Sequence, residues 1–190
     1  GTRLGLTSPA RLAELRSGNV VDETSEIFDF RSPFKTPNVG AVVDTAPSLF
    51  FRVGTDDASR SAFFERLVDV FYEGVATDQV LLPLYPEQPD LTGARHRLTL
   101  FLIQYWGGPT TYMEERGHPR LRMRHFPFHV GPLERDRWLL HMAAAVETVC
   151  DDVAVPVDVP AELMGYFVPA AEHLRNDTGL PITSANFPRT

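Results

Sequence analysis

The sequence predicts an all-α fold, and three observations lead to this prediction. Apolar residues recur at intervals of three and four in the segments that follow residue 57, as they do on one face of an α-helix. Glycine and proline separate these segments, for example at Gly107-Gly108 and Gly131-Pro132. Beyond residue 57 no useful length of chain alternates apolar and polar residues, so we expect no β-strand there.

Residues 1–47 differ from the rest and are predicted to form an N-terminal extension. They contain four prolines and the acidic stretch VVDETSEIFDF, without a long periodic pattern. One short helix is expected over residues 9–17, because Ser8 suits an N-cap, Pro9 suits the first helical position and Gly18 suits the end. The remainder is expected to be extended or partly disordered.

Two long helices are predicted in the first half of the remaining chain. The first begins near Asp57, and its apolar face consists of Phe63, Phe64, Leu67, Val68, Phe71, Tyr72 and Val75. A short connection through residues 81–86 leads to a second helix over residues 90–106, with the stripe Leu91, Ala94, Leu98, Phe101, Leu102 and Tyr105. The run Gly107-Gly108-Pro109 is expected to end it sharply.

The second half of the chain is predicted to contain a loop and two further long helices. Residues 109–124 lack an amphipathic pattern and indicate a loop with a short helical turn. The third helix begins at Gly131-Pro132 and carries Trp138, Met142, Ala145, Val146 and Val149. The fourth follows Asp158 and carries Leu163, Phe167, Ala170 and Leu174, and Pro169 is expected to kink or interrupt it.

Composition restricts the classes of function. A chain of 190 residues with 43% hydrophobic residues suits one domain of ordinary size, and its net charge of −7 disfavours binding to nucleic acid or anionic membranes. The single cysteine, Cys150, excludes an intrachain disulfide and fits a reducing compartment. The first residues lack a signal-peptide core, and the apolar run at residues 98–106 is too short to span a bilayer. We therefore expect a cytoplasmic protein without a membrane span.

The basic stretch ERGHPRLRMRHFPF, residues 115–128, is unusual in this acidic chain, with four arginines around two histidines. A solvated surface with ion pairs is one interpretation. A zinc site at His125 and His129 is another, but Pro127 argues against one continuous helix, and no carboxylate stands close to the pair in the sequence. Haem is the third interpretation: His125 would bind the iron, apolar neighbours would contact the porphyrin, and arginines would bind the propionates.

A family resemblance favours the third interpretation. The stretches FYEGVATDQVLLPLYPE, LTGARHRLTLFLIQYWGGPTTY and RGHPRLRMRHFPF, followed by ERDRW, resemble the truncated haemoglobins, specifically group II, the haemoglobin O type of actinobacteria. The similarity covers roughly residues 48–175. It implies a two-over-two helical sandwich over residues 48–176, between the extension and a C-terminal tail at 177–190, and a proximal segment that is mostly loop.

The resemblance also implies roles for individual residues. His125 matches the proximal iron ligand. Distal groups that stabilise the ligand are implied to be Tyr72, Tyr85 and Trp138. The distal wall is implied to be Ala94, Leu98 and Phe101, where Ala94 stands at the place of the distal histidine of many globins. Further haem-binding residues are implied to be Arg97, Tyr112, Leu121, Arg124 and Phe128.

The function that this resemblance implies is a haem b protein that binds O₂, CO or NO at a pentacoordinate iron, with redox chemistry on the ligand left open. A haem peroxidase or nitric-oxide dioxygenase is one alternative, and a haem-free globin signalling module is another. Expected partners are an external reductase and a second copy in a homodimer. Tyr72 and Trp138 also suit plain core packing, although a buried hydroxyl or indole N–H needs a hydrogen-bond partner. Two features depart from the family: VGTDDAS has one glycine where a pair is frequent, and Pro169 lies in the last helix.

Overall fold

The computed structural model describes residues 47–177, and helices are the only regular secondary structure in this range. They are α1 (Leu49–Arg52), α2 (Asp57–Val75), the 3₁₀ helix η3 (Leu82–Leu84), α3 (Thr92–Tyr105), α4 (Thr111–Arg116), α5 (Leu121–His125), α6 (Pro132–Asp152) and α7 (Val159–Leu174). The predicted all-α class is confirmed. The predicted helix at residues 9–17 lies outside the described residues. No helix within residues 47–177 is long and apolar enough to cross a membrane.

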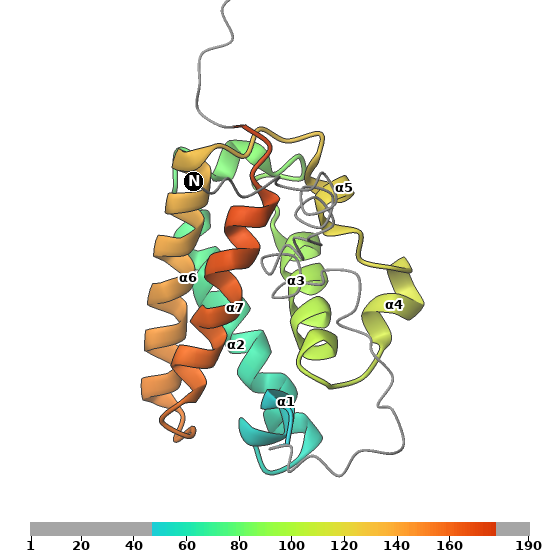
Figure 1. Ribbon diagram of the computed structural model, residues 1–190, viewed down its shortest axis with the longest axis vertical. Helices are drawn as coiled ribbons and strands as arrows, with labels where there is room; N and C mark the ends of the chain where they lie inside the picture. The colour runs from blue at the N-terminus through green and yellow to red at the C-terminus, as the bar shows by residue number, and fades with distance from the viewer. Residues whose placement is uncertain (1–46, 178–190) are drawn as a thin grey trace, which may run out of the picture. The chain divides into compact units, whose positions relative to one another are not determined.

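The helix α2 lies at the centre of the domain, where it packs against α6 on one side and α3 on the other (Figure 1). Its predicted apolar face is buried along its whole length: Phe63, Phe64, Leu67, Val68, Phe71, Tyr72 and Val75. Burial of each large apolar side chain contributes about 1.5–3 kcal/mol relative to exposure, so this face supplies much of the core. The helix starts where predicted because Asp56 and Ser59 form a capping box, in which Asp56 Oδ1 accepts from Ser59 N at 2.9 Å.

The segment between α3 and α6 is more helical than the sequence indicated. It contains α4 and α5, which have six and five residues. Helices this short are not stable by themselves and leave no periodic pattern. Contacts with other helices support them instead: the buried Gln104 side chain of α3 accepts from Met113 N at 3.0 Å, and α5 packs against α7.

The pair α6 and α7 lies side by side in Figure 1 and completes the core. Helix α6 begins as predicted at Gly131-Pro132, with Glu134 Oε2 accepting from Gly131 N at 2.9 Å. Of the two predicted effects of Pro169, a kink or an interruption, the interruption is wrong, because α7 is continuous through it. Proline leaves the carbonyl four residues earlier without a partner, and here that residue is the exposed Gly165, whose carbonyl water can reach.

A buried carboxylate joins the end of α2 to α6. The Asp78 side chain is fully buried, and its Oδ2 contacts Arg137 Nη2 at 2.7 Å and His141 Nε2 at 2.7 Å. Its Oδ1 accepts from Val80 N at 2.8 Å and from Leu81 N at 3.1 Å. Burial opposes ionisation of this carboxyl, but the hydrogen bonds hold its pKa well below the usual value.

We expect Asp78→Ala to lower the free energy of unfolding by about 3 kcal/mol, because it leaves Arg137 and His141 without their partner and two backbone amides unsatisfied. Urea unfolding followed by circular dichroism measures this. The contribution of Asp78 is present above the unfolded pKa, about 3.9, and is lost as the pH falls toward the lower folded pKa. The matched control is Asp69→Ala, which removes an exposed pair with Arg95 and should cost less than about 1 kcal/mol. An equal loss in both variants would contradict the special role of Asp78.

Candidate functional site

A cavity of about 680 Å³ lies among α2, α3, α5, α6 and α7, within the range of about 300–1,000 Å³ that is typical of ligand sites. All twelve residues that the sequence analysis singled out line it: Tyr72, Tyr85, Ala94, Arg97, Leu98, Phe101, Tyr112, Leu121, Arg124, His125, Phe128 and Trp138. They come from segments far apart in the chain. The structure therefore brings the whole predicted set to one place.

One wall of the cavity was missed by sequence reasoning. Helix α7 contributes Tyr166, Phe167, Ala170, Ala171 and Leu174 to the lining. Three of them, Phe167, Ala170 and Leu174, were recognised as part of the apolar stripe of this helix but were given no role at the site. An apolar stripe looks the same whether it packs on another helix or lines a cavity, so no signal in the sequence separates the two cases.

The His125 imidazole is held in one orientation. Its Nδ1 lies 2.8 Å from the carbonyl oxygen of Leu121, one turn earlier in α5. A carbonyl can only accept, so Nδ1 carries the proton and Nε2 keeps a free lone pair. A histidine whose second nitrogen is anchored in this way is the arrangement that metal-ligating imidazoles require. The zinc alternative receives no support from this geometry, because α5 ends at His125 while the ring of His129 contacts Glu134 and Asp177 instead.

The arginines near His125 are not neutralised by described carboxylates. Within residues 47–177, Arg116, Arg120, Arg122 and Arg124 form no ion pair with an acidic side chain. Arg124 donates to the backbone carbonyls of Pro119 at 2.6 Å and Arg116 at 2.8 Å, so part of its guanidinium serves the loop. The positive charge around this part of the cavity suits an anionic group brought by a ligand.

Arg97 on α3 differs from these arginines because it already has a carboxylate partner. Glu87 accepts from its Nη1 at 2.9 Å and from its Nη2 at 3.0 Å, and this hydrogen bonding lowers the pKa of Glu87. Both residues line the cavity. An anionic group of a ligand would therefore share Arg97 with Glu87.

Tyr72 and Tyr85 form a pair of hydroxyls in the cavity wall, with ring centroids 5.6 Å apart. Burial raises the pKa of both residues. The neighbouring phenol raises the pKa of Tyr72 further, whereas it opposes the rise for Tyr85. Both stay protonated at neutral pH, so both can donate to an acceptor in the cavity.

The Trp138 indole is the third polar group of this wall. It lies on α6, with its ring centroid 5.2 Å from Phe71 and 5.8 Å from Phe167. Its N–H has no hydrogen-bond partner among residues 47–177. An indole N–H can only donate, so a ligand in the cavity would give it an acceptor.

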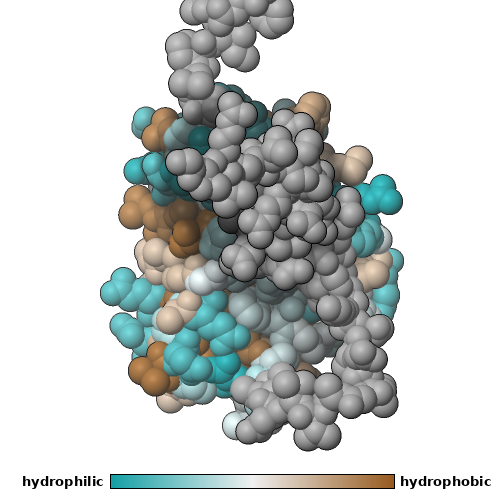
Figure 2. All heavy atoms as spheres, viewed as in Figure 1, coloured by the Kyte–Doolittle hydropathy of each residue, from teal (hydrophilic) through white to brown (hydrophobic). Residues whose placement is uncertain are grey.

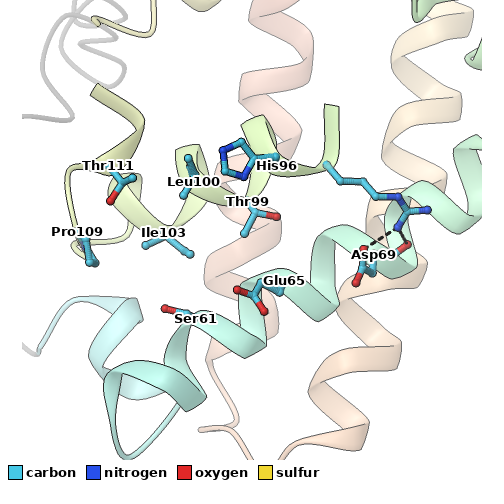
Figure 3. A pocket seen from close by; sticks show the side chains of 10 residues that line it. Ser61, Glu65, Asp69, His96, Thr99, Leu100, Ile103, Pro109 and Thr111 are labelled. Carbon is cyan, nitrogen blue, oxygen red and sulfur yellow. Dashed lines mark hydrogen bonds and ion pairs between the residues drawn. The ribbon is translucent and has the colours of Figure 1, made fainter. Parts of the chain in front are cut away.

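A second cavity, of about 480 Å³, lies between α2 and α3 (Figure 3). Its rim carries the ion pair of Arg95 Nη1 with Asp69 Oδ1 at 2.7 Å. Figure 3 shows Glu65 and Asp69 on α2 facing the α3 side of this groove, which carries Thr99. No group of three or more metal-binding side chains occurs in the described part of the chain. The groove offers no arrangement comparable to that around His125.

Comparison with known proteins gives the family. A family model described as bacterial-like globin matches residues 48–159. This chain belongs to the bacterial-like globins.

Its relatives within that family are group 2 truncated haemoglobins. The group 2 truncated haemoglobin YjbI of Bacillus subtilis is 38% identical over 122 residues, which span 64% of this globin and 88% of the relative. The crystal structure of a thermostable haemoglobin from the actinobacterium Thermobifida fusca is 52% identical, with a TM-score of 0.61, over 68% of this chain and 97% of that one. A truncated oxygen-avid haemoglobin from Bacillus subtilis is 35% identical, with a TM-score of 0.57, over 68% and 99%. The predicted group II resemblance and truncated globin fold are confirmed.

Membership of the truncated globins implies a haem cofactor and a small ligand. The cavity fits such a group on three observations. The walls around it carry leucine, phenylalanine and alanine from α3 and α7, which suit a flat apolar ring. Within residues 47–177 the imidazole of His125 makes its hydrogen bond through Nδ1, and Nε2 makes none. Arginines without a carboxylate partner in residues 47–177 stand beside it, which suits two propionates.

Proposed function

We propose that this globin binds haem b through His125 and uses it to bind O₂ and other diatomic ligands at a pentacoordinate iron. The observation that carries the proposal is the hydrogen bond from His125 Nδ1 to the Leu121 carbonyl, which leaves Nε2 as the free ligating nitrogen in the cavity. Ala94 also lines the cavity and has no side-chain atom that could bind iron, so we expect no second protein ligand from that position.

Three donors in the cavity wall support O₂ as a ligand. A haem iron in the cavity would supply the place where a diatomic molecule binds and takes up partial negative charge. Trp138 has an indole N–H without a protein partner in residues 47–177, and the buried hydroxyls of Tyr72 and Tyr85 stay protonated in the same lining. Donors that are already in place stabilise such charge without reorganisation. The oxygen-avid relative from Bacillus subtilis supports the same interpretation.

The test of this proposal is the visible spectrum of the purified protein in its ferric, ferrous and CO-treated states. A haem b globin gives a Soret band in all three states, and a ferrous spectrum without added ligand that reports five-coordinate iron. A colourless protein that fails to take up added haemin would contradict this proposal and would favour the haem-free signalling module.

The cavity gives less support to a peroxidase or dioxygenase. General acid–base steps need a titratable side chain close to the reacting ligand. The titratable carboxylates of the lining are already engaged, Glu87 with Arg97 and Glu134 with the backbone at Gly131. We therefore place redox chemistry second, and propose that any electrons come from a separate reductase in a reducing cytoplasm.

A homodimer is part of the proposal as well. Leu133 and Leu140 stand seven residues apart on α6, hence on one face, and each is 56% exposed. Figure 2 shows apolar groups gathered at the left edge of the visible face, where α6 lies in Figure 1. Sedimentation of the wild type and of Leu133→Glu/Leu140→Glu tests this: we expect a dimer that the double variant converts to a monomer.

Removal of residues 1–45 should leave haem content and the visible spectrum nearly unchanged. The reason is that the family match begins at residue 48, and that the cavity lining described here comes from residues 72–174. The measurement is the ratio of Soret to protein absorbance for the truncated and full chains, purified side by side. A truncated chain that folds but holds clearly less haem would show that the extension contributes to the haem site.

A further inference from the structure

The loop that follows His125 is held by the end of α7 as well as by its own neighbours in sequence, since Phe128 N donates to the His125 carbonyl at 3.0 Å. Residues 126–130 form turns and a bend and contain no helix. The Asn176 side chain reaches them from just beyond α7: its Nδ2 donates to the Phe128 carbonyl at 2.6 Å and to the His125 carbonyl at 3.3 Å. Its Oδ1 accepts from Val130 N at 2.9 Å.

These contacts use the amide of Asn176 completely. A carboxamide has two donor hydrogens and one oxygen, and the loop offers two carbonyls and one N–H in matching places. The backbone repeats the connection, because Asn176 N donates to the Val130 carbonyl at 2.9 Å. A carboxylate of the same size could replace the acceptor but neither donor, and it would place negative charge against two carbonyl oxygens.

Neighbouring contacts connect the same two segments. The His129 ring pairs with Asp177 and lies 3.5 Å from Glu134, and Arg122 Nη1 donates to the His173 carbonyl at 3.3 Å. Asn176 differs from them in one respect: it is the residue that bonds to His125 itself. The His125 residue is thus held at its ring by the Leu121 carbonyl, and at its own carbonyl by Phe128 N from the loop and by Asn176 from the end of α7.

We propose that Asn176 is a positioning residue for the His125 imidazole, so that the end of α7 sets the geometry of the axial iron ligand. The inference rests on the proposed function for its effect on haem, but its structural part concerns the protein alone. Partners that orient a metal-ligating histidine typically change metal affinity by about 10–100-fold when they are replaced. Because Asn176 acts on the main chain and the Leu121 contact persists, we expect about a tenfold faster loss of haem in Asn176→Asp.

The experiment compares Asn176→Asp and Asn176→Ala with the wild type and with Val149→Ala. Val149 is buried in α6 and does not line the cavity, so its replacement destabilises the domain without touching the His125 loop. Haem loss is followed by transfer to excess apomyoglobin. The Fe–His stretching frequency of the ferrous protein is measured by resonance Raman spectroscopy, and amide hydrogen exchange at Val130 is measured in the apoprotein.

We expect both Asn176 variants to lose haem faster, to shift or broaden the Fe–His band, and to exchange the Val130 amide faster. Val149→Ala should lower the melting temperature with an unchanged Fe–His band. A wild-type Fe–His band and wild-type haem loss in Asn176→Asp would overturn the inference while leaving haem binding through His125 intact. If the wild type bound no haem, the proposed function would fail. Separately, unchanged amide exchange at Val130 in the Asn176 variants would refute the inference that Asn176 holds the His125 loop.

Discussion

His125→Leu is expected to abolish stable haem binding while the helical domain persists. The variant removes the nitrogen that we propose as the axial ligand, and leucine keeps an apolar side chain of moderate size in the cavity wall. The helices pack through residues that His125 does not support, since the core of α2, α6 and α7 consists of fully buried side chains such as Phe64, Leu67 and Met142. Soret absorbance after purification and haemin titration measure the loss, and far-UV circular dichroism reports the retained helix.

The control for this experiment is His118→Ala in the same basic segment. His118 is exposed, and its Nδ1 accepts from Arg120 N at 3.3 Å, so it supports the turn into α5 rather than the cavity. We expect its haem content to stay near that of the wild type. A full haem complement in His125→Leu, with an unchanged iron spectrum, would show that another residue binds the iron.

The long helices could be predicted because their cause is local. Each signal lies within a few residues of the helix or helix end that it determines. This holds for the apolar spacing of α2, for its capping box and for the break at Gly107-Gly108. The two short helices could not be predicted, since α4 depends on the side chain of Gln104 in α3 and α5 packs against α7, and neither has a period of its own. The chain also passes Pro169 without a break, because the carbonyl that proline leaves unpaired belongs to an exposed glycine.

The candidate site also has a part that the sequence predicts and a part that it does not. The predicted lining residues lie in motifs with a recognisable order, and the structure places all of them around one cavity. Their partners were not predictable. Arg97 pairs with Glu87, which lies 10 residues away in the sequence, and Asn176 bonds to His125, which lies 51 residues away. Only the folded structure brings these partners together. Asn176 has no pattern around it, and an asparagine just past a helix is ordinarily a cap or a surface residue.

Among the distal groups, the geometry singles out Trp138 as the dominant donor. The rings of Tyr72 and Tyr85 lie in contact, with centroids 5.6 Å apart, so when one hydroxyl is removed the other remains beside it to donate to the ligand. The indole of Trp138 has no such alternative within residues 47–177, and aromatic contacts with Phe71 and Phe167 hold its ring in place. A hydrogen bond from a fixed donor to a partly charged acceptor contributes about 1.5–3 kcal/mol.

Trp138→Phe is therefore expected to raise the O₂ dissociation rate by about 10–100-fold, more than Tyr72→Phe or Tyr85→Phe. The smaller ring also opens space, so part of the increase has a steric origin. Carbon monoxide separates the two causes, because CO takes up less charge on the iron and gains less from a donor. Stopped-flow dissociation of both gases from the three variants is the measurement. We expect CO dissociation to change far less than O₂ dissociation, whereas equal acceleration of both gases in Trp138→Phe would mean that the indole acts as a steric gate and not as a hydrogen-bond donor.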